Sequence, residues 1–127
     1  MQRILSKEPL LNEKEAGYTN RIHADDLAEV CLAALEKGED GDIFNVCDGE
    51  ISKMTDYFNT ITDLMKLPRL PQVSLDEARQ AMSPLMFSYM TDSRSISNRK
   101  MLEKLGIKLK YSNMLEGLKD SINAEKR

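Results

Sequence analysis

The densest group of polar side chains that could do chemistry lies between Asn20 and Asp26, and it includes the only histidine of the chain, His23. If this stretch is a strand, alternation places Arg21 and His23 on one face and Asn20 on the other. Arg21 would then hold an anionic group of a substrate, and His23 would orient that substrate. In the other interpretation, His23 bonds a nearby aspartate or backbone carbonyl, and Arg21 pairs with Asp25.

Two further groups could contribute to a substrate site. Met86 and Tyr89 belong to a dense patch of methionine and aromatic side chains, which could line an adaptable pocket or form ordinary core. Arg94 and Arg99 flank a Ser/Asn-rich stretch and could reach a phosphate, or could simply solvate the start of a helix. The candidate substrate-binding residues are therefore Asn20, Arg21, His23, Met86, Tyr89 and Arg94.

The sequence lacks the groups on which several kinds of catalysis depend. A dinucleotide site needs glycines between a strand and a helix, but the closely spaced Gly38 and Gly41 follow a predicted helix and lie in an acidic turn. No tyrosine is followed four positions later by lysine, and no Gly-x-Ser-x-Gly elbow accompanies His23. Cys31 and Cys47 form no Cys-x-x-Cys pair, and one histidine cannot complete a Cys/His zinc site. We expect no catalytic, cofactor-binding or metal-binding residue in this chain.

Composition narrows the class of protein. The chain has 127 residues and a net charge of −3, so it forms one domain at most, or part of one. Without a block of lysines and arginines it is not expected to bind nucleic acid. Its longest apolar run, from Val30 to Leu35, is far shorter than the roughly 20 residues of a membrane span. No secretory signal is evident at the start, so we expect a cytoplasmic protein.

The candidate residues are positioned by a predicted strand, helix and second strand. Residues 18–23 predict a short strand, and Asp25 or Asp26 would cap the helix that Gly38 ends in a left-handed conformation. Residues 43–47 are rich in strand-forming side chains. A crossover of this kind usually joins parallel strands of an α/β sheet. Apolar side chains recur at helical spacing at Leu27, Val30, Cys31, Ala34 and Leu35, which predicts that this side of the helix packs on a core.

The remainder of the sequence is predominantly helical. A helix is expected from Ser52, and the capping box between Ser74 and Glu77 opens another. Two more helices are expected after Asn98 and Asn113. The predicted fold class is therefore α/β, with a partial Rossmann-like sheet followed by a mostly helical C-terminal subdomain.

Four stretches of the sequence carry motifs that follow one another in a recognisable order. Residues 18–28 contain Arg-Ile-His-x-Asp-Asp-Leu, and residues 42–50 contain Phe-Asn-Val-x-Asp. Residues 93–106 contain Ser-Arg, Asn, Leu and Leu-Gly at matching intervals, and residues 111–118 contain Tyr-x-x-x-x-Glu-Gly-Leu, with Ser112 at the usual proline position. Together they resemble the closing part of extended short-chain dehydrogenases/reductases, the NAD(P)-dependent epimerase/dehydratase family.

The resemblance implies that the chain corresponds to less than half of such an enzyme. Residues 1–66 would hold the last elements of the Rossmann-like domain, and residues 67–127 a small helical substrate-binding subdomain. In the family, the opening half carries the Gly-x-x-Gly-x-x-Gly loop and the Tyr-x-x-x-Lys pair, which perform hydride transfer with NAD or NADP. This chain would bind an anionic or sugar-like substrate and would be inactive alone.

A second hypothesis places the chain in a different class, a non-catalytic interaction module. A piece of a sheet leaves an edge strand and an apolar helix face uncovered. Such a chain would associate with itself, or would complement a separately encoded cofactor-binding half. A third possibility is a truncated reading frame without retained function.

Overall fold

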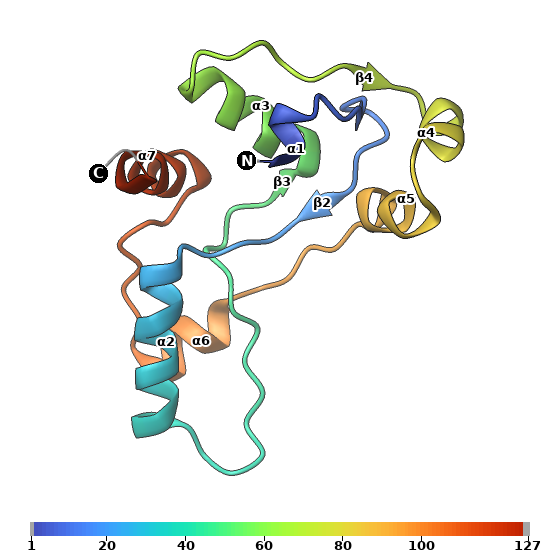
Figure 1. Ribbon diagram of the computed structural model, residues 1–127. Helices are drawn as coiled ribbons and strands as arrows, with labels where there is room; N and C mark the ends of the chain where they lie inside the picture. The colour runs from blue at the N-terminus through green and yellow to red at the C-terminus, as the bar shows by residue number, and fades with distance from the viewer. Residues whose placement is uncertain (1, 126–127) are drawn as a thin grey trace. The chain divides into compact units, whose positions relative to one another are not determined.

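The computed structural model describes residues 2–125, in which short strands and helices alternate and helices predominate (Figure 1). This confirms the predicted α/β class. No helix of the described chain is both long and apolar enough to cross a membrane. In chain order the elements are α1 (Gln2–Leu5), β1 (Leu10–Leu11), β2 (Tyr18–Thr19), α2 (Ala24–Lys37), β3 (Ser52–Lys53), α3 (Met54–Leu64), β4 (Gln72–Val73), α4 (Leu75–Ala81), α5 (Pro84–Thr91), α6 (Arg99–Leu105) and α7 (Met114–Glu125).

The chain divides into two compact units, and each unit is built from two separate segments of the sequence. Unit 1 comprises residues 1–19 and 51–94, and unit 2 comprises residues 20–50 and 95–127. The division after residue 66 that the resemblance implies concerns the parts of a larger fold, and it stays a prediction.

Unit 1 holds the strand pairs found in the described chain. β1 pairs with β4 in parallel, with Leu10 opposite Gln72. β2 pairs with β3 in antiparallel orientation, with Tyr18 opposite Lys53. These short ladders support the helices that follow them, α3 and α4. The buried apolar side chains of the unit form one cluster: Ile4, Leu10, Leu11, Ala16, Met54, Leu70, Ala78 and Met90.

Two helices of unit 1 begin at a serine cap, and for α4 this is the predicted Ser74. Ser74 Oγ accepts a hydrogen bond from the backbone N–H of Glu77 at 3.2 Å, so the predicted cap of α4 is present. Ser83 Oγ accepts from the backbone N–H of Met86 at 3.2 Å. Pro84 follows at the first helical position of α5, where its missing N–H costs nothing. Each cap satisfies a backbone donor and stabilises its helix by about 1 kcal/mol.

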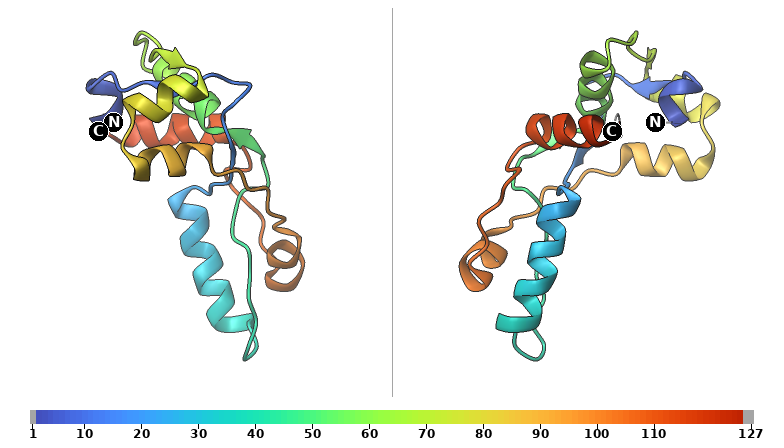
Figure 2. Two further views of the ribbon diagram at one scale, coloured as in Figure 1. Left: turned by 90° about the vertical axis from the view of Figure 1, so that its right-hand side faces the viewer. Right: turned by 60° about the vertical axis from the view of Figure 1, so that its left-hand side comes forward.

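Unit 2 is built on α2, which packs against α6. Val30 of α2 and Met101 and Leu105 of α6 form its buried centre. The prediction that one apolar stripe of α2 packs on the core is therefore only partly right, because Leu27, Cys31 and Leu35 are exposed. Phe44 and Val46, from the segment after α2, are half-buried against the same centre. Figure 2 shows this segment turning back at the end of α2 as an extended chain, without a strand arrow.

Lysines of α6 hold the turn that follows α2. Lys100 Nζ lies 3.1 Å from Asp42 Oδ1, and Lys104 Nζ lies 2.6 Å from Asp42 Oδ2. The backbone N–H of Glu39 also donates to Asp42. These contacts hold the pKa of the Asp42 carboxyl well below its usual range, and the hydrogen bond from Lys104 has the largest effect. The turn is therefore fixed to α6 by charge-assisted hydrogen bonds.

The two helix ends of unit 2 that carry glycine differ from each other. Gly106 ends α6 in the left-handed conformation, with φ of 63°. Gly38 was predicted to do the same for α2, but its φ is −71°, and its N–H donates to the carbonyl of Ala34 at 2.9 Å. Because this bond already satisfies the last turn of α2, the chain leaves the helix in an extended conformation.

The predicted strand–helix–strand crossover is only partly formed. β2 is limited to Tyr18–Thr19, and its partner is β3 rather than residues 43–47. Residues 43–47 are extended, and the side chains of residues 43–46 alternate between exposed and half-buried positions, as in a strand, while Cys47 is buried. Within residues 2–125 no strand lies beside them, so no ladder of hydrogen bonds forms.

Candidate functional site

The polar stretch predicted to hold the site leads directly into α2, and His23 is the N-cap residue of that helix. Its Nδ1 accepts a hydrogen bond from the backbone N–H of Asp25 at 3.0 Å. This corrects the prediction that Asp25 or Asp26 is the cap. An unprotonated ring nitrogen can satisfy a free N–H of the first turn as a carboxylate would, and Asp25 and Asp26 then occupy the first turn itself.

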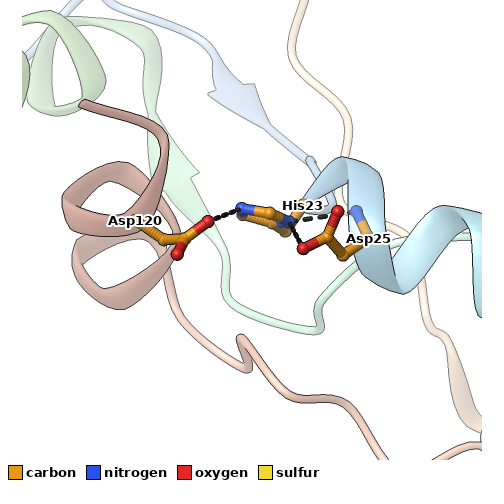
Figure 3. A group of neighbouring side chains, drawn as sticks. All are labelled: His23, Asp25 and Asp120. Atoms are coloured by element: carbon orange, nitrogen blue, oxygen red, sulfur yellow. Dashed lines mark hydrogen bonds and ion pairs between the residues drawn. The ribbon is translucent and has the colours of Figure 1, made fainter. Parts of the chain in front are cut away.

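The second ring nitrogen of His23 bonds Asp120 of α7 (Figure 3). Nε2 lies 3.0 Å from Asp120 Oδ2, and since Nδ1 is an acceptor, Nε2 carries the proton and donates. The ring also stacks on Tyr111, with 4.0 Å between the centroids. Only 8% of the His23 side chain is exposed. This is the bonded arrangement that the second interpretation of the sequence expected for His23.

His23, Asp25 and Asp120 also bear comparison with a metal site, because one possible ligand atom of each lies within 4.8 Å of the others. Imidazole and carboxylate are common zinc ligands. However, Nε2 and Asp120 are in direct hydrogen-bond contact, and Nδ1 is used by the helix cap. A metal ion would have to displace one of these bonds. The arrangement is fully accounted for by hydrogen bonding that joins α2 to α7.

The other two residues of the predicted group, Asn20 and Arg21, lie on the extended chain before α2. Asn20 Oδ1 accepts a hydrogen bond from the backbone N–H of Ile96 at 3.2 Å. Arg21 Nη1 donates to the Sδ atom of Met114, the first residue of α7, at 3.0 Å. Asn20, Arg21 and His23 are therefore gathered in unit 2, at the start of α2.

Asp26 is a buried carboxylate that the sequence analysis considered only as a cap. It is 4% exposed. Its Oδ1 accepts from the backbone N–H of Lys110 at 3.0 Å, and its Oδ2 accepts from that of Tyr111 at 2.9 Å. These bonds hold the chain before α7 against the first turn of α2. A signal was available in the sequence, because Asp26 shares the core face of the helix with Val30 and Ala33, at i+4 and i+7.

Asp48, in the second motif of the resemblance, is also buried. It is 7% exposed, and its Oδ1 accepts from the backbone N–H of Glu50 at 2.9 Å. Burial raises the pKa of the Asp48 carboxyl, and the Glu50 N–H and the Arg21 guanidinium oppose the rise. The backbone N–H of Asp48 donates to the carbonyl of Arg21 at 2.7 Å. Arg21 is thus held beside a carboxylate as well as beside α7.

The remaining predicted residues, Met86, Tyr89 and Arg94, lie in unit 1. Met86 is half-buried against the apolar cluster of that unit, as ordinary core packing would have it. Tyr89 is 61% exposed. The exposed Arg94 pairs with Asp92, with 3.1 Å between Nε and Oδ2. The structure therefore divides the predicted residues into two groups of three, one in each unit.

An open groove of about 800 Å³ runs between α2 and residues 105–110 of unit 2. Glu29 and Glu36 line it from α2, and Lys108 and Lys110 from the other side. None of the predicted substrate-binding residues lines it. The groove therefore gives no support to the predicted site, and its charges are mixed in sign.

Comparison with known proteins bears on the fold as a whole. No family model and no curated protein matches the chain. Among solved structures, a conserved protein of unknown function from Silicibacter pomeroyi DSS is 29% identical, with a TM-score of 0.78 over 93% of this chain. PA4631, a nucleoside-diphosphate-sugar epimerase from Pseudomonas aeruginosa, is 25% identical, with a TM-score of 0.68 over 87% of this chain. The human epimerase family protein SDR39U1, solved with NADPH, is 14% identical, with a TM-score of 0.74 over 94% of this chain.

The match covers only part of each of these proteins. The chain corresponds to 40% of the Silicibacter pomeroyi protein, 37% of the Pseudomonas aeruginosa epimerase and 41% of the human protein. The described fold is thus the fold of a portion of epimerase-type proteins. More than half of each solved chain lies outside the match.

Proposed function

We propose that this chain is the substrate-binding C-terminal portion of an NAD(P)-dependent epimerase/dehydratase-type oxidoreductase of the extended short-chain class, inactive on its own. One observation carries the proposal. Two solved proteins are 29% and 25% identical to this chain, and the matches cover 93% and 87% of it. The same matches cover only 40% and 37% of those two proteins. The order of the four sequence motifs supports the same assignment.

The proposal divides the chemistry between two parts of a complete protein. NAD or NADP, and the groups that transfer hydride, would belong to the part outside the match. The sequence here contains neither a glycine loop before a helix nor a Tyr-x-x-x-Lys pair. The human relative was solved with NADPH, which agrees with a nicotinamide cofactor for a complete protein. The present chain would shape the pocket for an anionic or sugar-like substrate.

Within the proposal, each predicted residue has a definite role. Arg21 would offer its guanidinium to an anionic group, and Asn20 would stand beside it as a hydrogen-bonding group. His23 would act as a positioning residue, because both of its ring nitrogens are used in bonds that join α2 to α7. Tyr89 and Arg94, both exposed in unit 1, would contribute an aromatic surface and a second cation. Met86, half-buried in the same unit, would contribute an apolar side chain.

Cofactor binding and turnover by the purified 127-residue chain test the proposal. NADPH and NADH are titrated into the chain and followed by the fluorescence of the dihydronicotinamide. Turnover is then assayed with nucleoside-diphosphate sugars, with the Pseudomonas aeruginosa epimerase as a positive control. We expect neither binding nor turnover by the chain alone. Saturable cofactor binding, or turnover above the level of heat-denatured chain, would contradict the division of labour.

A second function is favoured by the apolar side chains that unit 2 leaves exposed. Leu35 is 84% exposed and Ile43 is 79% exposed. Such residues suit a non-catalytic module that associates with itself or with a separate cofactor-binding chain. A sharp monomer in light scattering, together with no binding of a hydrophobic dye, would count against this second function.

A further inference from the structure

Unit 1 contains a small apolar pocket of about 260 Å³, which none of the predicted substrate-binding residues lines. The pocket lies between α1 and residues 67–71, which connect α3 to β4. Its apolar lining consists of Ile4, Leu5, Leu67, Pro68, Leu70 and Pro71. Ile4 and Leu70 are each 5% exposed and belong to the core of the unit, whereas Leu5 is 69% exposed. The pocket therefore reaches from the core of unit 1 to its surface.

Two cationic side chains complete the lining, one from each side of the pocket. Lys7 follows α1, and Arg69 lies in the connecting segment. Arg69 pairs with Asp63, with 2.7 Å between Nη2 and Oδ2 and 3.0 Å between Nε and Oδ1. The exposed Lys7 forms no ion pair with any residue of the range 2–125. Since no acidic side chain of that range lines the pocket, its lining is positively charged.

The backbone of Lys7 is strained. Lys7 and Lys66 are the residues other than glycine that adopt a positive φ in the described chain, with values of 56° and 57°. Each follows the end of a helix, where glycine is the usual residue because it adopts this conformation without strain. Strained positions of this kind concentrate where ligands bind. Only Lys7 of the two lines the pocket, so Lys66 shows what the backbone conformation does without the site.

The volume of the pocket limits its occupant to a small molecule. A cavity of about 150 Å³ holds benzene, so a pocket of about 260 Å³ accommodates roughly ten non-hydrogen atoms. A protein partner would instead need an interface of roughly 20–30 residues from each side. The apolar lining suits a hydrocarbon group, and a lysine without an ion pair suits an anionic group at its end. Charge and size together point to a molecule with both parts.

We propose that the pocket binds a small amphiphilic carboxylate, of the size of a medium-chain fatty acid. The hydrocarbon part would lie among the leucine and proline side chains. The carboxylate would accept hydrogen bonds from Lys7 Nζ and from the N–H groups of Arg69 that Asp63 does not use. Because the pocket uses none of the predicted substrate-binding residues, this inference does not depend on the proposed function.

Titration of the 127-residue chain with sodium octanoate tests the proposal, because the size of octanoate matches the pocket. Methyl NMR spectra should show saturable shifts at Ile4, Leu67 and Leu70, which line the pocket, and no shift at Leu85. Leu85 is the control for adsorption to apolar surface, because it is 83% exposed on α5, outside the pocket. Octylamine has a similar hydrocarbon chain and the opposite charge, so it should bind at least about tenfold more weakly. No saturable shift at the pocket, an equal shift at Leu85, or equal affinity for octylamine would overturn the proposal.

Two glycine variants separate the side chain of Lys7 from its backbone. Lys7→Gly should weaken octanoate binding about tenfold, because it removes the charged donor. Lys66→Gly is the matched control, since it relieves a backbone of nearly the same φ outside the pocket, and it should leave the affinity unchanged. Both variants should unfold at or above the temperature of the parent chain, because glycine relieves the strain.

The outcomes of this second experiment are equally decisive. Equal affinity of the two glycine variants for octanoate would overturn the proposal, because the side chain of Lys7 would then not contact the ligand. Lys7→Arg keeps the charge and should bind octanoate with an affinity close to that of the parent. If the methyl signals of Ile4 and Leu70 shift with protein concentration in the absence of octanoate, a second copy fills the pocket and the proposal is wrong.

Discussion

Replacing Asp26 with asparagine should loosen the start of α2 from the chain that leads to α7. The carboxylate is 4% exposed and accepts two backbone hydrogen bonds, from Lys110 at 3.0 Å and from Tyr111 at 2.9 Å. Asparagine has one acceptor oxygen and one NH2 group, so one backbone N–H would face another donor. Losing a hydrogen bond to a charged group costs about 1.5–3 kcal/mol, and a buried donor without an acceptor costs about 1–3 kcal/mol.

These contributions overlap, and we expect Asp26→Asn to lower the free energy of unfolding by about 2–4 kcal/mol, a large share of the roughly 5–15 kcal/mol of an ordinary domain. Urea unfolding followed by far-UV circular dichroism measures this change. The matched control is Asp25→Asn, the same chemical change at the neighbouring residue, whose side chain is 69% exposed. As a first-turn acid, Asp25 should contribute only about 0.3–1 kcal/mol. Equal destabilisation by the two variants would refute the account of Asp26.

Two other predictions concern unit 2. His23→Ala should lower the free energy of unfolding by about 1–2 kcal/mol, because it removes the N-cap acceptor of α2 and the bond to Asp120. His23→Asn should recover part of the loss by restoring an acceptor. No recovery by His23→Asn, or no loss in His23→Ala, would show that the cap is unimportant. Asp42 contributes stability above the ordinary aspartate pKa of 3.8, and this contribution is lost as the pH falls towards its lower folded value, since the hydrogen bond from Lys104 favours the ionised form. The free energy of unfolding of Asp42→Asn should therefore fall less than that of the parent chain as the pH is lowered below 3.8. Acid-unfolding curves of the two chains that run parallel would contradict the assignment.

Local signals in the sequence predicted most of the helices correctly. The capping serine of α4 acts through its side-chain oxygen within its own turn, so the spacing of Ser74 and Glu77 reveals it. The helices expected after Asn98 and Asn113 likewise begin there, at Arg99 and Met114. Such features depend on a few neighbouring residues and need no knowledge of the rest of the fold.

Features that depend on distant residues could not be predicted in the same way. Asp120 lies 97 positions after His23, and no pattern in the sequence pairs these two side chains. The sequence favours an aspartate as the cap of α2, because a carboxylate always offers an acceptor, whereas His23 offers one at Nδ1 and its Nε2 bonds a residue distant in the sequence. Residues 43–47 have the composition of a strand, but a strand needs a neighbour, and composition does not supply one.

The central claim is that this chain completes an epimerase-type fold. Its most direct test is the thermal unfolding of a chimera, in which this chain replaces the 40% of the Silicibacter pomeroyi protein that it matches. Scanning calorimetry is carried out on the chimera and on the isolated 127-residue chain. If the claim holds, the chimera unfolds in a single transition at a temperature above that of the isolated chain, because the two parts share buried surface. Two separate transitions, one of them at the temperature of the isolated chain, would contradict it.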